Sequence, residues 1–97
     1  MLRIQEMDKD LTIPKLDGGG VPIFYYKGKP FTGIVFSKFD NGVVVKEEEY
    51  ENGYQEGWIR YYFENGNLNQ ESKNHNNVTI DNAFKEWGQD GNLISSF

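Results

Sequence analysis

The chain of 97 residues contains no cysteine, which excludes disulfide bonds, thiolate catalysis and cysteine-ligated zinc. Alanine, the strongest helix former, occurs once, at Ala83. No segment approaches the roughly 20 consecutive apolar residues that cross a bilayer as a helix, and the first residues lack the apolar stretch of a signal peptide. We therefore expect a soluble, cytoplasmic protein with little helix.

Groups that carry catalysis or bind metals are also scarce. His75 is the only histidine, and its neighbours Asn74, Asn76 and Asn77 are polar, so an exposed turn residue is the expected reading. The triplet Gly18–Gly20 is not followed by the Lys-Ser or Lys-Thr of a phosphate-binding loop, which favours a plain linker. We expect no enzymatic activity, no cofactor and no metal site.

The charge balance is acidic. Ten Lys and Arg residues face fifteen Asp and Glu residues, giving a formal net charge of -5 and a sequence pI near 4.8. Nucleic acids and anionic membranes repel such a surface, so neither is an expected partner. A basic protein is the easier partner electrostatically.

What the chain does contain favours strands and turns. Aromatic residues make up 15% of the sequence and there are eleven glycines. Aromatic side chains are enriched in strands, and glycine and asparagine accept the positive φ of tight turns. Three such turns recur, because Gly42, Gly66 and Gly91 follow Asn or Asp and lie 24 and 25 residues apart.

The repeat extends to both sides of these turns. Nine residues before each turn glycine stand Gly33, Gly57 and Asn82, all types that tolerate positive φ, and two residues after each stands Val44, Leu68 or Leu93. Each unit is therefore predicted to be a β-hairpin with a type I′ turn, and a fixed period of this length indicates a stack of such units.

The predicted fold class is all-β, an antiparallel meander of repeated hairpins in one elongated sheet, forming a single domain over residues 1–97. Residues 1–22 are expected to form an N-terminal cap, either a short helix interrupted at Pro14 or an edge segment, and residues 23–97 the repeats. The predicted strands are Ile23–Tyr26, Phe31–Phe39, Val43–Tyr50, Trp58–Phe63, Leu68–Lys73, Thr79–Trp87 and Asn92–Ser96.

The stretch Tyr50–Leu68 carries an aromatic residue, Asn-Gly, a glycine, Trp, paired aromatics and Glu-Asn-Gly in order, and Tyr25–Gly33 carries paired tyrosines followed by two spaced glycines. This pattern resembles the bacterial variant MORN repeat of the YwqK-type antitoxin or immunity proteins, over about residues 23 to 94. The last repeat departs from it, because Asn74–Asn82 lacks the aromatic and glycine landmarks and Gly88 replaces an aromatic. The resemblance implies a MORN-like sheet and a protein that binds and neutralises a toxin.

Two sets of residues are candidates for partner binding. On a strand, Glu47, Glu49 and Glu51 share one face, where they form either a solvated surface or an acidic docking face. Trp58, Arg60 and Tyr62 likewise share a face. Repeat aromatics usually fill a core, but a thin sheet cannot cover both of its faces, so this aromatic and arginine face is a candidate contact surface.

Two functions follow as expectations. The first is an immunity protein or antitoxin that neutralises a bacterial toxin in a stoichiometric complex, as a monomer or weak homo-oligomer. The second is a structural repeat module in scaffold or envelope assembly, without a toxin partner. A carbohydrate-cleaving enzyme would require two carboxylates facing one cleft, and the sequence supplies no such pair.

Overall fold

The computed structural model describes residues 2–81 and 83–96, which form strands and turns and no helix. Within this described part, no helix is long and apolar enough to cross a membrane. The strands are β1 Arg3–Gln5, β2 Leu11–Leu16, β3 Pro22–Tyr26, β4 Lys29–Pro30, β5 Gly33–Lys38, β6 Val44–Glu51, β7 Tyr54–Tyr62, β8 Leu68–His75, β9 Val78–Thr79, β10 Lys85–Trp87 and β11 Leu93–Ser96.

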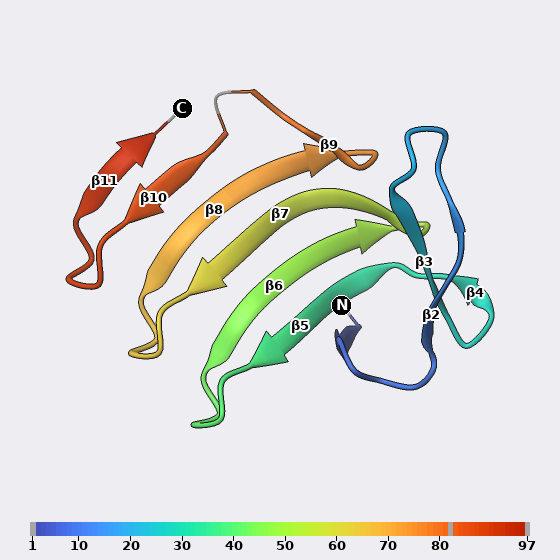
Figure 1. The fold of residues 1–97 in the computed structure, drawn as a ribbon, viewed down its shortest axis with the longest axis horizontal. Helices are drawn as coiled ribbons and strands as arrows, with labels where there is room; N and C mark the ends of the chain where they lie inside the picture. The colour runs from blue at the N-terminus through green and yellow to red at the C-terminus, as the bar shows by residue number, and fades with distance from the viewer. Residues whose placement is uncertain (1, 82, 97) are drawn as a thin grey trace.

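The strands form two sheets. The main sheet has the order β1-β5-β6-β7-β8-β10-β11, with β9 added to the end of β8, and from β5 onward every neighbouring pair is antiparallel. These strands lie side by side as an arched meander (Figure 1). The all-β fold class and the antiparallel meander predicted from the sequence are therefore confirmed.

The turns at the two ends of the main sheet differ. At Asn52-Gly53 and Asn76-Asn77 both central residues have positive φ, which defines the predicted type I′ turn. At Gly42, Gly66 and Gly91 only the glycine has positive φ. There the glycine N–H donates to the carbonyl three residues earlier, which is a type I turn followed by a bulge. The type I′ prediction was therefore wrong for the three turns that define the repeat.

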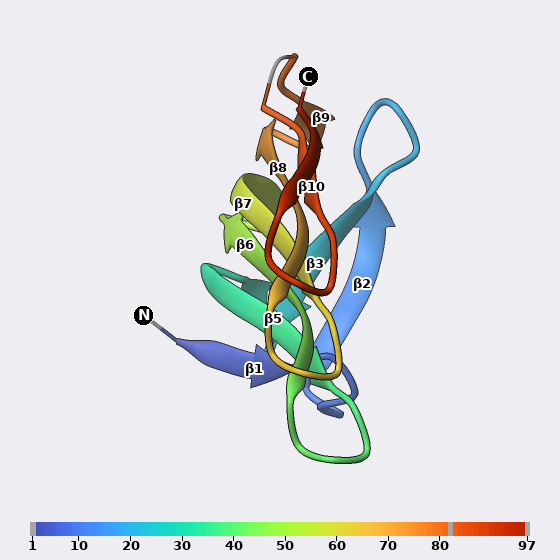
Figure 2. The same cartoon turned by 90° about the vertical axis from the view of Figure 1, so that its left-hand side faces the viewer.

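The smaller sheet, of order β2-β3-β4, lies to one side of the main sheet (Figure 2). The core lies where the two sheets meet. Its buried hydrophobic residues are Ile4, Phe31, Val35 and Tyr50, and the ring of Phe24 stacks on Tyr50 with centroids 4.6 Å apart. From Tyr54 onward Asn74 is the one buried residue among those described, so the distal hairpins are stabilised mainly by strand pairing.

The described part of the N-terminal segment, residues 2–22, forms strands and turns, so the short-helix alternative is not found there. Strand β1 pairs in parallel with β5 at the edge of the main sheet, which is the edge-segment alternative. The smaller sheet joins residues from both sides of the boundary expected between positions 22 and 23.

The last predicted hairpin differs most from the structure. The single strand predicted over Thr79–Trp87 is wrong, because β9 ends at Thr79 and β10 begins only at Lys85. Gly33 and Gly57 have the expected positive φ, of 152° and 109°. Asn82, the third member of this set, lies outside the described residues.

Candidate partner-binding surface

Pairing of β6 with β7 brings most of the predicted contact residues onto one face of the main sheet. Glu47 lies opposite Arg60, and Arg60 lies opposite Glu71 of β8. Trp58 and Tyr62 are two residues from Arg60 on either side, and alternation along β7 directs all three to the same face. We call this surface the outer face.

Trp58 lies at the centre of one cluster on the outer face. The Arg60 guanidinium carbon lies 4.9 Å from the ring centroid and the Lys73 ammonium nitrogen lies 5.2 Å from it. Arg60 Nε also donates to Glu71 Oε2 at 3.0 Å. Each cation over an indole ring contributes about 0.5–1 kcal/mol at an exposed site, so Trp58 is held in a defined orientation while part of its surface stays accessible.

A second cluster is centred on Phe36 of β5 and Glu47 of β6. Arg3 and Lys38 both lie over the Phe36 ring, at 5.0 and 5.7 Å from its centroid. Arg3 Nη1 donates to Glu47 Oε2 at 2.6 Å, and the Tyr62 hydroxyl donates to Glu47 Oε1 at 2.6 Å. The two clusters therefore adjoin through β7, which carries both Tyr62 and Trp58.

The electrostatics of Glu47 and Tyr62 reflect this contact. Partial burial opposes ionisation of Glu47, but the hydrogen bonds from Tyr62 and Arg3 outweigh it and lower the pKa of this carboxyl. Burial first, and then the hydrogen bond to the Glu47 carboxylate, raises the pKa of Tyr62 to about 12. Glu47 is thus held as a carboxylate and Tyr62 as a neutral hydroxyl donor near neutral pH.

The other two predicted glutamates lie differently. Glu49 also belongs to the outer face, and its Oε1 accepts the backbone N–H of Trp58 at 3.3 Å. Glu51 is exposed at the end of β6, beside the Asn52-Gly53 turn. Glu47 and Glu49 are therefore engaged by neighbours, and Glu51 lies at the margin of the outer face.

Five residues of the outer face were missed by the sequence reasoning, and they are Arg3, Phe36, Lys38, Glu71 and Lys73. Period-two alternation on β5 and β8 is a signal that could have identified the four on those strands. Arg3 had no such signal, because it reaches Phe36 and Glu47 only through the parallel pairing of β1 with β5.

Repeat aromatics usually fill a core, but most of those in this sheet do not. Trp58, Tyr61, Tyr62, Phe63 and Trp87 are all half-buried rather than buried. The reason is geometric, since the smaller sheet packs against the main sheet near β5, at the Tyr50 end of β6 and at the start of β7, and the core residues lie there.

The opposite face of the main sheet carries a polar network around Glu48. Its carboxylate accepts hydrogen bonds from the Tyr50 hydroxyl at 3.2 Å and from the Gln55 amide, and it pairs with Lys46 at 3.0 Å. Burial raises the pKa of Tyr50. A hollow of about 220 Å³ lies beside this network, and Glu48 is the one carboxylate that lines it. Two carboxylates therefore do not meet there.

His75 is exposed as expected, but it is the last residue of β8 rather than a turn residue, and its Nδ1 lies 2.9 Å from Glu56 Oε1. In residues 2–81 and 83–96 there is no cluster of three or more His, Cys, Asp and Glu side chains that could hold a metal ion.

Comparison of the chain with protein-family models, with curated proteins and with solved structures gives no match. The geometry of the two faces and the repeat pattern of the sequence are therefore the grounds on which a function can be proposed.

Proposed function

We propose that this chain is a protein-binding immunity protein or antitoxin, which neutralises a toxin domain by occupying its surface in a stoichiometric complex. The observation that carries the proposal is the outer face, where Trp58, Arg60 and Tyr62 lie together and half-exposed on the main sheet. Tryptophan, tyrosine and arginine are the residue types enriched in the energetic centres of protein interfaces.

The outer face is organised before any partner binds. Trp58 is flanked by Arg60 and Lys73, and Tyr62 is bound to Glu47. Fixing rotamer-rich side chains at an interface costs about 0.5–1.5 kcal/mol for each side chain, and here much of that ordering is already present in the free protein. Such a surface suits tight, stoichiometric binding, and inhibition by occlusion requires no catalytic turnover.

The net charge of -5 favours a basic toxin and faster association with it. On the outer face itself, Glu47 pairs with Arg3 and Glu71 pairs with Arg60, so a partner there meets paired charges around aromatic rings. We therefore assign long-range attraction to the acidic protein as a whole and short-range specificity to the outer face.

The test is co-expression with toxin domains encoded beside its gene, read as survival of the host and as complex formation with purified proteins. Trp58→Ala should weaken the complex by about 2 kcal/mol or more, as at a central interface residue. Tyr61→Ala is the matched control, because Tyr61 lies on the same strand but on the opposite face. Lack of protection against every neighbouring toxin, or equal effects of the two substitutions, would contradict the proposal.

A second function, a self-associating structural module, has one observation in its favour. Strand β11 is the last strand of the main sheet, and its residues Leu93 and Ile94 are 55% and 63% exposed. Exposed apolar side chains on an edge strand favour pairing with another chain. Light scattering over a range of concentrations separates the two functions, since concentration-dependent oligomers without a heterologous partner would favour the structural module.

A further inference from the structure

The three repeat turns lie at one end of the main sheet, which we call the turn end. It contains two adjoining hollows. The larger, of about 530 Å³, lies between the second and third turns and is lined by Phe39, Phe63, Glu64, Asn69 and Gln89, among others. The smaller, of about 440 Å³, lies between the first and second turns, and Phe39 and Glu64 line it too. Tyr62 also lines the larger hollow and Lys38 the smaller, so both hollows adjoin the outer face, although neither includes the Trp58 cluster.

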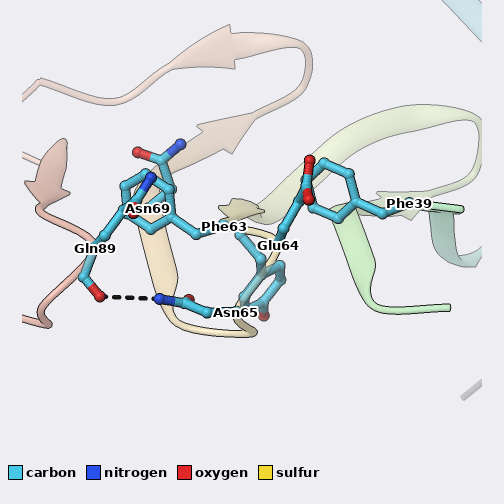
Figure 3. A pocket seen from close by; sticks show the side chains of 7 residues that line it. Phe39, Phe63, Glu64, Asn65, Asn69 and Gln89 are labelled. Atoms are coloured by element: carbon cyan, nitrogen blue, oxygen red, sulfur yellow. Dashed lines mark hydrogen bonds between the residues drawn. The ribbon is translucent and has the colours of Figure 1, made fainter. Parts of the chain in front are cut away.

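The two hollows occupy equivalent positions of the repeat. Phe39 precedes the first turn as Phe63 precedes the second, and Glu64 begins the second turn as Gln89 begins the third. Figure 3 shows the Glu64 side chain beside the Phe39 ring, and the Phe63 ring on the side of Asn69 and Gln89. Each ring therefore lies next to the first residue of the following turn.

A ladder of side-chain amides holds these walls in place. Asn41 Nδ2 donates to the carbonyl of Glu64 at 3.3 Å, and one repeat later Asn65 Nδ2 donates to the carbonyl of Gln89 at 3.1 Å (Figure 3). The same two asparagines accept the backbone N–H two residues ahead through their Oδ1 atoms. Neighbouring turns are thereby fixed relative to one another, and the hollows between them are features of the fold.

The smaller hollow combines the ring of Phe39 with the carboxylate of Glu64. Asp40 supplies a second carboxylate on its rim, and none of the ion pairs among the described residues involves Asp40 or Glu64. Lys38 also lines the smaller hollow, but its ammonium nitrogen lies over Phe36, 5.7 Å from the ring centroid. An aromatic face beside a carboxylate matches a planar cation, which can stack on the ring and pair with the carboxylate at once.

We propose that the turn end of the main sheet is a binding site for an arginine side chain carried on an extended segment of a partner protein. The guanidinium stacks on Phe39 and pairs with Glu64, while the adjoining hollow at Phe63, Asn69 and Gln89 receives the neighbouring residues of that segment. The site adjoins the outer face through Tyr62 and Lys38, and it does not depend on the partner being a toxin.

The repeat spacing sets the length of the segment. The two subsites lie one hairpin apart, which is two strand spacings or roughly 10 Å. About three residues of extended chain span that distance. Arginine is favoured over lysine because the guanidinium is planar and binds a carboxylate through two N–H groups, whereas the ammonium is a compact and strongly hydrated charge.

The experiment is an NMR titration of the isotopically labelled protein with a capped pentapeptide that has arginine at its centre and glycine elsewhere. The matched ligands replace the arginine by citrulline, which keeps the shape and removes the charge, and by lysine. The matched variants are Glu64→Gln, which gives the second turn the residue of the third, and Asp90→Asn, which removes a charge from the third turn.

The arginine peptide is expected to bind with a dissociation constant on the order of 1 mM and to shift the backbone amides of Gly42 and Gly66 and the side-chain amides of Asn41 and Asn65. Citrulline or Glu64→Gln should weaken binding about fivefold, the size of one exposed charge contact, and Asp90→Asn should leave it unchanged.

Equal binding of the arginine and citrulline peptides, shifts centred on Trp58, or no shifts at all would overturn the site. Equal losses of peptide affinity for Glu64→Gln and Asp90→Asn would also overturn it, because the affinity would then depend on the net charge of the protein and not on Glu64. The titration contains no toxin, so its result is independent of the proposed function.

Discussion

Substitution of Gly53 by alanine probes the junction between the two sheets. Gly53 occupies the Asn52-Gly53 turn with a φ of 90°. Its N–H donates to the carbonyl of Phe31 at 2.8 Å, and its carbonyl accepts the N–H of Phe24 at 2.9 Å. A Cβ at this position would lie 2.6 Å from Ile23 Cγ2 and 2.8 Å from the carbonyl oxygen of Phe24.

Two costs add in this substitution. A residue with a Cβ in a left-handed conformation loses about 1–2 kcal/mol, and forcing an extra carbon into a packed contact costs typically about 1–3 kcal/mol. The total of about 2–5 kcal/mol is a large part of the roughly 5–15 kcal/mol that stabilises a domain. Gly66→Ala is the control, because Gly66 has the same φ of 90° and a Cβ there would meet nothing within 4 Å.

The assay is urea unfolding of both variants and of the parent protein, followed by circular dichroism. In Gly66→Ala we expect the free energy of unfolding to fall by the conformational cost alone. In Gly53→Ala it should fall by about 1–3 kcal/mol more, because the packing cost is added. Thermal unfolding should agree, since 1 kcal/mol corresponds to about 4–8 °C in Tm for a domain of this size. Equal losses in the two variants would refute the packing of the Gly53 turn against β3.

Three further predictions concern polar contacts. Glu47→Gln should bring the pKa of Tyr62 down from about 12 toward 10, as measured by ultraviolet titration with Tyr62→Phe as the reference. Asp17 has a lowered pKa, chiefly through the Asn77 amide, so its contribution to stability is present above its unfolded pKa and is lost as pH falls through the folded value. Asn77→Gly, which tolerates the positive φ of that position, should therefore raise the Asp17 pKa in a carboxyl NMR titration and reduce the loss of stability in acid. Asn65→Asp should cost about 0.5–1.5 kcal/mol in denaturant unfolding, because the donor to the Gln89 carbonyl is lost while the acceptor for Asn67 remains; no measurable loss would contradict the ladder.

Local signals in the sequence predicted the hairpins because each hairpin is specified locally. Gly42, Gly66 and Gly91 mark tight reversals. Alternation along each strand was enough to group Glu47 with Glu49 and to group Trp58 with Arg60 and Tyr62, but the pairing of β6 with β7 was needed to bring the two groups to one face. The turn type was not predictable from the Asn-Gly or Asp-Gly pair, since the same Asn-Gly pair forms a type I′ turn at Asn52-Gly53 and a type I turn with a bulge at Gly42.

Contacts between segments far apart in the sequence carried no comparable signal. The parallel pairing of β1 with β5 and the packing of Phe24 on Tyr50 depend on where the chain returns after the small sheet. No period relates residues 2–30 to the hairpins, so Arg3 and the location of the core were missed. The core lies at this junction because only there does a second sheet exclude water from the main sheet.

Within the repeat, the glycines that shape the turns behave differently from the strand positions that face outward. The turn glycines recur with their backbone conformation, each with φ near 90°. The outward positions instead change from hairpin to hairpin, because Phe36, Arg60 and Lys85 occupy one equivalent position of the repeat. A stack that needed only to be stable could repeat the same outward residue in every hairpin. If the chain binds a partner as proposed, variation at these positions beside constant turn glycines would place its specificity in the side chains that differ between the hairpins.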